Sequence, residues 1–289
     1  MKKKKKQKHS PGLLTMLRRT LAGRVREQSV GIEEERKAIL SEGSDFFIRE
    51  AYKTLRTNVV YALAEEEAES KVIVVTSAMQ SEGKSITAVN LAISFAEMNN
   101  KVLLLDCDLR RPKLARLLKM SAKVGLSNVL LKPELLDEAI QAGPVPNLDV
   151  LSSGDIPPNP SELLGSSRMH RLLEGLRSRY DYVILDTSPV NMVTDACVLV
   201  PQGNGVLFVV RANRSDRDAV AHAVEQLSYS RAKILGFVLN GVGNDFVRYG
   251  KYRYGKYKKY GYGRHYGYGH GYGYGYGYHP HLDEDDRAE

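Results

Sequence analysis

Short, unbroken runs of apolar residues recur along the middle of this chain, and helical patterns separate them. The clearest runs are residues 72–75, 102–105 and 182–185, which are rich in Val, Ile and Leu. A continuous apolar run fits a strand that is buried on both faces, as strands are in parallel sheets. Strands that alternate with helices predict an α/β fold, in which helices cover both faces of a parallel β-sheet.

The same patterns give the positions of the expected elements. Strands are expected at residues 72–75, 102–105, 148–151, 182–185, 205–210 and 234–239, and helices at residues 44–67, 85–98, 161–178 and 215–228. Polar motifs follow three of these strands directly. Because ligands of parallel sheets bind beyond the carboxyl ends of the strands, the three motifs are expected to share one site.

The first motif follows the strand at residues 72–75 and reads Ser-Ala-Met-Gln-Ser-Glu-Gly-Lys-Ser over residues 77–85. It matches the phosphate loop, in which backbone N–H groups at the start of a helix bind phosphate oxygens. Lys84 would reach the β- and γ-phosphates of ATP, and the Ser85 hydroxyl would coordinate Mg²⁺. A chance Gly-Lys-Ser would rarely lie between a buried strand and a helix.

The other two motifs are acidic. Asp106 and Asp108 follow the second strand, and Asp186 follows the strand at residues 182–185. Beside a triphosphate, paired carboxylates can hold a metal ion or accept a proton, whereas burial of their charges without a cation would be costly. An Asp opposite a phosphate loop is typical of an Mg²⁺ site. The alternative is that one of the paired aspartates only caps a helix.

The beginning of the chain is strongly basic, with an unbroken lysine run from Lys2 to Lys6 that contributes to the formal net charge of +8. Such a run could hold the chain near anionic lipid, and a solvated, disordered start is the alternative. The two cysteines, Cys107 and Cys197, form no disulfide framework. No apolar run reaches the ~18 residues of a membrane span, so the chain is expected to be cytoplasmic.

The end of the chain contains twelve of its seventeen tyrosines, most of them beside glycine. Frequent glycine frees the backbone and prevents a packed core, so these tyrosines are expected to be displayed. They are Tyr249, Tyr252, Tyr254, Tyr257, Tyr260, Tyr262, Tyr266, Tyr268, Tyr272, Tyr274, Tyr276 and Tyr278. A nucleotide site upstream makes them candidate phosphate acceptors. A cohesive low-complexity segment and stacking on single-stranded nucleic acid are the alternatives.

In combination, these motifs resemble those of the bacterial tyrosine kinases (BY-kinases) of capsule and exopolysaccharide assembly. Residues 104–112, Leu-Leu-Asp-Cys-Asp-Leu-Arg-Arg-Pro, are similar to the second motif of that family, and residues 151–164 resemble its Gly-x-x-Pro-Pro-Asn-Pro-x-Glu-Leu-Leu segment. Residues 50–58 resemble the helix by which the family assembles rings. The resemblance runs from about residue 47 to residue 242 and includes the tail, because family members end in a tyrosine cluster.

The resemblance implies a fold, cofactors and residue roles. The fold would be that of a P-loop NTPase of the ParA/MinD-like group, and the cofactors would be ATP and Mg²⁺. The implied residues are Ser81, Glu82, Gly83, Lys84, Ser85 and Ile86 for ATP binding, Lys84, Asp106 and Asp108 for catalysis, Ser85, Asp106 and Asp186 for the metal, and Glu50, Lys53 and Arg56 for the oligomer interface. Either Asp106 or Asp108 would be the base that receives the tyrosine proton.

Three positions depart from the family pattern. Ala78 stands where phosphate loops usually have Gly, Ser81 stands where Gly is common, and Lys53 replaces an arginine of the interface helix. Because Lys lacks the bidentate fork of Arg, the change at Lys53 bears on ring assembly rather than on catalysis.

A ParA/MinD-like switching ATPase, which does not phosphorylate protein, is the alternative function. Those proteins typically carry a signature lysine at the position of Met79, five residues before Lys84. A binding scaffold with a decayed site is a third possibility, against which the intact Lys84, Asp106, Asp108 and Asp186 argue.

The sequence thus predicts a basic, disordered N-terminal segment at residues 1–42, a P-loop tyrosine kinase domain at residues 43–243 and a flexible tyrosine-rich tail at residues 244–289. The chain is expected to phosphorylate its own tail in trans and to regulate exopolysaccharide or capsule synthesis and export. Expected partners are further copies of the chain, for example in a ring, the cytoplasmic end of a membrane chain-length regulator or co-polymerase as activator, and a tyrosine phosphatase, but no specific nucleic acid. That activator and the lysine run would place the chain peripherally at the inner membrane.

Overall fold

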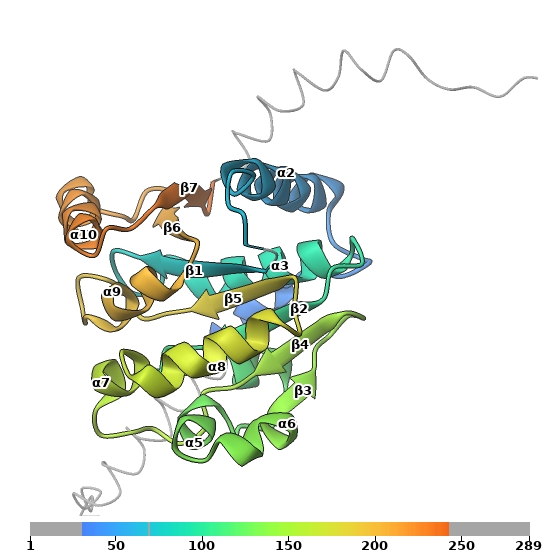
Figure 1. The fold of residues 1–289 in the computed structure, drawn as a ribbon. Coiled ribbons are helices and arrows are strands. Elements are labelled where there is room, and N and C mark those ends of the chain that lie inside the picture. Colours follow the sequence, from blue (N-terminus) through green and yellow to red (C-terminus); the bar gives the residue numbers. More distant parts are fainter. Residues whose placement is uncertain (1–30, 69, 243–289) are drawn as a thin grey trace, which may run out of the picture. The chain divides into compact units, whose positions relative to one another are not determined.

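The computed structural model describes residues 31–68 and 70–242. Seven strands of this part form one sheet in the order β3-β4-β2-β5-β1-β6-β7 (Figure 1). The strands are β1 (Lys71–Ser77), β2 (Val102–Asp106), β3 (Ile140–Ala142), β4 (Leu148–Leu151), β5 (Tyr182–Asp186), β6 (Gly205–Arg211) and β7 (Ile234–Asn240). All neighbours pair in parallel except the edge strand β3, which runs antiparallel to β4.

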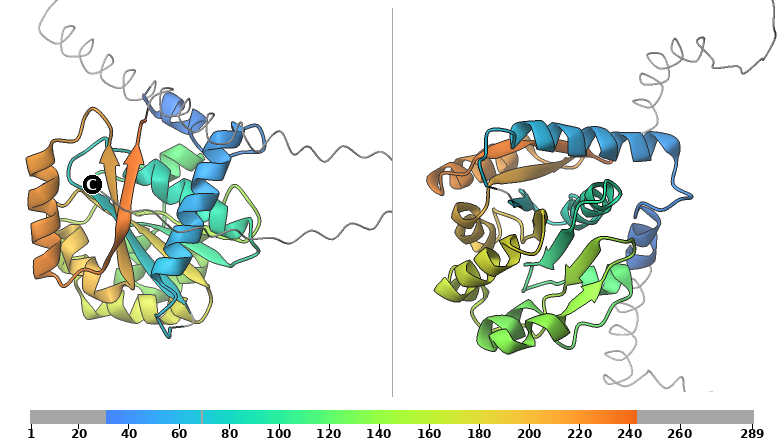
Figure 2. Two further views of the ribbon diagram at one scale, coloured as in Figure 1. Left: turned by 90° about the horizontal axis from the view of Figure 1, so that it is seen from above. Right: turned by 45° about the vertical axis from the view of Figure 1, so that its right-hand side comes forward.

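Helices cover both faces of the sheet, as the sequence predicted, and an apolar core lies under each layer (Figure 2). The helices are α2 (Phe46–Ala62), α3 (Lys84–Ala96), α4 (Leu114–Leu118), α5 (Leu126–Leu131), α6 (Leu136–Ala139), α7 (Pro160–Leu164), α8 (Ser167–Arg177), α9 (Asp195–Leu199) and α10 (Arg217–Tyr229), with 3₁₀ turns η1 (Pro133–Leu135) and η2 (Val200–Gln202). On one face α3 packs against β1, β2 and β5, and α2 lies against α3 and β7. On the other face α8 contacts β5 and α9 contacts β1.

The helix expected at residues 161–178 is in fact two helices. α7 ends at Leu164, and the Ser166 side chain caps α8 by accepting a hydrogen bond at Oγ from the Met169 N–H, 3.3 Å away. A serine at this position starts a new helix because its hydroxyl pairs with an N–H that has no partner inside the helix. The prediction of one helix was wrong for this reason.

The packed part of the chain begins before residue 43, where the sequence analysis placed the start of the domain. Residues 31–37 are helical, and Leu40 is buried in the core on the α3 side. The buried side chain of Asn90, on α3, holds this segment: its Oδ1 accepts from the Leu40 N–H and its Nδ2 donates to the Ala38 carbonyl, each over 2.8 Å. The expected disordered segment therefore includes residues that dock on the domain.

Several expectations concern residues that lie outside the described ranges. They are the lysine run from Lys2 to Lys6 and the twelve tail tyrosines. Within the described ranges, no helix combines the length and the apolar character that a membrane crossing needs.

Candidate active site

The strand order brings the three sequence motifs to one edge of the sheet. β5 lies between β2 and β1. Asp186 of β5 is opposite Asp106 of β2 on one side and opposite Val75 of β1 on the other. The phosphate loop after β1, the aspartates after β2 and Asp186 at the end of β5 therefore meet at the carboxyl ends of neighbouring strands. This convergence is the one that a parallel sheet predicts.

The backbone conformation of the phosphate loop bears on the two departures from the usual pattern, Ser81 and Ala78. Ser81 has a φ of 64° and Gly83 a φ of 99°, both in the left-handed region that favours glycine. Ala78 is fully buried and has no positive φ, so an alanine fits there without strain. The loop leads into α3, whose first N–H groups have no partner inside the helix and can bind an anion.

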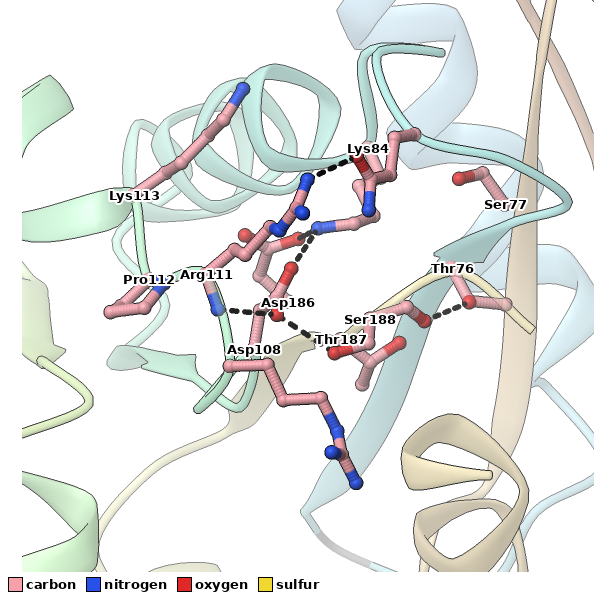
Figure 3. Close-up of polar contacts among 12 residues, drawn as sticks. Thr76, Ser77, Lys84, Asp108, Arg111, Pro112, Lys113, Asp186, Thr187 and Ser188 are labelled. Atoms are coloured by element: carbon pink, nitrogen blue, oxygen red, sulfur yellow. Dashed lines mark hydrogen bonds and ion pairs between the residues drawn. The ribbon is translucent and has the colours of Figure 1, made fainter. Parts of the chain in front are cut away.

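Lys84 lies between two buried carboxylates (Figure 3). Its Nζ is 3.0 Å from Oδ2 of Asp108 and 3.6 Å from Oδ1 of Asp186. Burial lowers the pKa of Lys84, but the charges of Asp186 and Asp108 raise it by more, so the lysine stays charged. The ammonium group is thus held beside the loop, where a phosphate would bind.

Asp106 caps a helix as well as facing this cluster. Its Oδ2 accepts from the N–H groups of Lys113 at 3.2 Å and Leu114 at 3.0 Å, at the start of α4, and its Oδ1 accepts from the Asp108 N–H at 3.3 Å. Burial and the charge of Asp186 raise the pKa of Asp106 to about 7. The helix-cap alternative therefore describes one thing that Asp106 does in this structure.

Asp186 is the residue best suited to a metal ion. It is fully buried, and among the described residues neither of its oxygens accepts a well-formed hydrogen bond. Burial raises its pKa, while the charge of Lys84 and the nearby Ser85 hydroxyl lower it by less. Buried carboxylate oxygens that accept no hydrogen bond from the described residues and lie beside a hydroxyl fit Mg²⁺, which binds through one or two carboxylates and keeps several waters. The residues present therefore fit the ion.

Residues that the sequence analysis missed hold the loop in place. Asn240, at the end of β7, donates from Nδ2 to the Glu82 carbonyl over 3.0 Å, and a Cβ on Gly83 would lie 1.8 Å from that amide. The Glu82 side chain is buried; it accepts from the Met79 N–H at 2.8 Å and from the Ser215 hydroxyl. Asn240 and Ser215 belong to no recognisable motif, because they lie at the end of β7 and in the loop after β6, far along the chain from the phosphate loop.

The remaining expected residues lie in other places. The partly buried Ile86 side chain packs against the core on the α3 side. On α2, Lys53 pairs with Glu50 over 2.7 Å, while Arg56 donates to the carbonyl and hydroxyl of Ser94 on α3. The helix that carries these three residues therefore rests on α3, the helix that follows the phosphate loop.

Cys107, between the two aspartates, is a packing residue. It is fully buried in the core that α8 and α9 cover. Burial, followed by the charge of Asp106, raises the pKa of its thiol well above the ordinary value. A neutral thiol is a poor nucleophile.

Comparison with known proteins places this site in context. Residues 70–226 match the model of a family described as an AAA domain. Tyrosine-protein kinase YwqD of Bacillus subtilis (strain 168) is 42% identical over 192 residues, which are 66% of this chain and 80% of that protein. Among solved structures, the chimerical protein CapA2B2 has a TM-score of 0.66 and 36% identity over 70% of this chain and 88% of its own. The kinase domain of the Escherichia coli tyrosine kinase ETK has a TM-score of 0.64 and 33% identity over 76% of this chain and 80% of its own.

Proposed function

The chain belongs to the bacterial tyrosine-protein kinases and has their nucleotide-binding P-loop domain, and from this premise we propose how its buried charges serve phosphoryl transfer. The observation that supports the proposal most directly is the position of Lys84, between Asp108 and Asp186 and beside the phosphate loop. Phosphoryl transfer needs mainly positioning and neutralisation of charge on the phosphate oxygens. Lys84 exchanges a carboxylate partner for phosphate when ATP enters the loop.

We assign the two aspartates after β2 to different tasks. Both oxygens of Asp106 accept backbone N–H groups, and its side chain is fully buried. Asp108 is 7% exposed and binds Lys84 directly, so it loses a partner when that lysine turns to phosphate. Asp108 is therefore the base that accepts the tyrosine proton. The proton leaves late from a phenol whose pKa is about 10, so the base needs only to be close.

Mg²⁺, when bound, neutralises charge on the phosphate oxygens, and Ser85, Asp186 and Asp106 are the residues that would hold it. The loop residues Ser81, Glu82, Gly83 and Ile86 contribute backbone N–H groups to the phosphates. The remaining work of the protein is to keep Lys84 and Asp108 in place while the acceptor approaches.

The acceptors are the tyrosines between Tyr249 and Tyr278, and they are phosphorylated in trans by a neighbouring copy. Glycine between the tyrosines lets each one reach a site on another chain. Each phosphate adds about 1.5 to 2 negative charges, so several would reverse the positive charge of the tail and separate the copies by repulsion. Glu50, Lys53 and Arg56 form the contact between copies.

The cellular role that we propose is control of capsule or exopolysaccharide synthesis and export from the cytoplasm. An activator at the cytoplasmic end of a membrane chain-length regulator and the run from Lys2 to Lys6 would bring the kinase to the inner membrane, and a tyrosine phosphatase would reset it. The support is the resemblance of the whole motif set together with the basic start of the chain.

A mixing experiment tests the transfer in trans. A Lys84→Met chain with its tail is incubated with Mg²⁺, ATP and an active chain that ends at residue 243, and phosphotyrosine is mapped by mass spectrometry. The inactive chain should gain phosphate on the tail, and by itself it should gain none. If the active chain phosphorylates a synthetic Gly-Tyr peptide but not the inactive chain, transfer between copies is wrong. If it hydrolyses ATP and modifies neither, the switching ATPase is the correct function.

Assembly is measured in the same preparation. Full-length protein that carries phosphate should sediment as a smaller species than the same protein after phosphatase treatment. If both forms sediment alike, repulsion between tails does not control assembly, although the kinase activity would stand.

A further inference from the structure

Asp195, the first residue of α9, is a fully buried carboxylate with no role in the site described above. Arg110, which follows β2, pairs with it through two contacts: Nε to Oδ2 at 2.9 Å and Nη2 to Oδ1 at 3.2 Å. The hydroxyl of Ser161, in the first turn of α7, also donates to Oδ1 of Asp195. The buried Asp195 carboxylate therefore joins the motif at residues 104–112 to the start of α7.

Ser188 connects this group to the active site. Its Oγ lies 2.8 Å from Oδ1 of Asp108 and 3.2 Å from Oδ2 of Asp195. A serine hydroxyl has one proton, so it can donate to only one of these carboxylates at a time. Both oxygens of Asp195 already accept from Arg110 and one also accepts from Ser161, so the Ser188 proton is left for Asp108.

The donation matters because few contacts orient Asp108. Its Oδ1 accepts from Ser188 and, at 3.2 Å, from the Arg111 N–H, while its Oδ2 faces Lys84 (Figure 3). When Lys84 turns to phosphate, Ser188 is the side chain, among the residues that the structure describes, that still holds this carboxylate by a hydrogen bond. Displacement of a catalytic group by about 1 Å can lower the rate about a hundredfold.

We propose that Asp195, neutralised by Arg110, is a positioning residue that keeps the Ser188 hydroxyl directed at Asp108. The inference rests on the proposed function, which makes Asp108 the base. Its physical basis is the cost of an unpaired buried charge. Without Arg110, the Asp195 carboxylate would keep the Ser161 hydroxyl at Oδ1 but would need another donor at Oδ2, and the Ser188 proton lies within reach of that oxygen.

The proposal differs from a simpler role for Arg110, whose side chain is 39% exposed and could touch a phosphate or the acceptor itself. If Arg110 acts by contact, its loss cannot be repaired elsewhere in the chain. If it acts by neutralising Asp195, removal of the Asp195 charge should repair its loss. A double variant therefore separates the two roles.

The experiment compares Arg110→Ala, Asp195→Asn and the double variant in the full-length protein, with transfer to a synthetic Gly-Tyr peptide as the readout. Arg110→Ala should lower kcat by roughly ten- to a hundredfold, with KM for ATP within about twofold, because the reacting groups are misplaced while the phosphate loop is intact. The double variant should recover at least about threefold in kcat over Arg110→Ala. A double variant as slow as Arg110→Ala, or slower, overturns the proposal in favour of direct contact.

Ser188→Ala tests the same link without changing a charge, in case Asp195→Asn does not fold. It should lower kcat with KM for ATP unchanged, and adding Arg110→Ala to it should cause little further loss. A Ser188→Ala variant as active as the wild type overturns the proposal. Asp137→Asn, which breaks an exposed pair with Arg179, is the matched control and should leave kcat unchanged.

The failure of this inference is distinct from that of the proposed function. If the wild-type protein phosphorylates the peptide and the variants behave otherwise than expected, only the role of Asp195 is wrong. If the wild-type protein makes no phosphotyrosine, the kinase mechanism itself is wrong.

Discussion

Replacement of Lys84 by Met should cost stability as well as activity. Lys84 is 8% exposed and faces Asp106, Asp108 and Asp186, which are 0%, 7% and 0% exposed. Removal of one partner from a buried ion pair typically costs about 3 to 5 kcal/mol, because the other charge is left without compensation. The free energy of unfolding of a whole domain is about 5 to 15 kcal/mol. The variant should therefore still fold, but with a much smaller free energy of unfolding.

The loss should grow with pH. Burial raises the pKa of both Asp106 and Asp186, and the charge of Lys84 opposes that rise, so loss of Lys84 raises both values further. A carboxyl group with a raised pKa in the folded chain gives stabilisation that is complete below its unfolded pKa of about 4 and is lost as the pH rises through its folded pKa. For Asp106 in the wild type that window ends at about 7, and in the variant it ends higher.

Urea unfolding of the wild type and of Lys84→Met, in EDTA at pH 5 and pH 8, measures this effect. The difference in the free energy of unfolding between the wild type and Lys84→Met should be larger at pH 8 than at pH 5. When Asp108→Asn is added to Lys84→Met, this difference should become smaller. The control is Lys233→Met, which breaks a pair with Glu66 that is partly exposed on both sides and should cost about 0 to 1 kcal/mol. If Lys84→Met loses no more than this control at pH 8, the reasoning from a buried cluster is wrong. The same measurement shows whether the inactive chain in the mixing experiment is folded.

Two further substitutions test the packing of the domain. Asn90→Leu removes both hydrogen bonds that hold Ala38 and Leu40 and should cost about 1 to 3 kcal/mol; hydrogen exchange at the Leu40 amide should quicken, and an unchanged rate would contradict the docking of residues 31–40. Gly175→Ala lies inside α8 where an added Cβ meets no atom within 4 Å, so it should stabilise the protein by about 0.5 to 1 kcal/mol in thermal unfolding, and a lower melting temperature would contradict that.

The part of the site that could be predicted from the sequence is the part that local patterns determine. The apolar run at residues 72–75 becomes β1, the phosphate loop follows it, and the parallel sheet then places Asp106 and Asp186 opposite each other. The positions of Lys84 and both acidic motifs follow from this topology, since each is attached directly to a strand end.

The partners that support those residues could not be predicted in the same way. Arg110 and Asp195 are separated by 85 positions, and Asn240 is separated from Glu82 by 158. Asp195 begins a short helix and Asn240 ends a strand, and both are common residue types there, so nothing local marks either one as a partner of the site. By contrast, Gly165 and Ser166 did carry a readable signal for the break between α7 and α8, because serine is a strong N-cap.

The charge balance of the cluster connects its stability to its function. Lys84 faces three carboxylates, and burial of this negative charge raises the pKa of Asp106 and Asp186. That surplus destabilises the folded chain, as buried unpaired charge does in general. In the mechanism proposed above, the same surplus would let Lys84 turn to a phosphate, because a cation brought with the nucleotide would take its place. A cluster that fixed side chains neutralised fully would be more stable, but its lysine would stay bound to the carboxylates and would not turn to the substrate. A cost in stability is therefore inherent in a site of this kind.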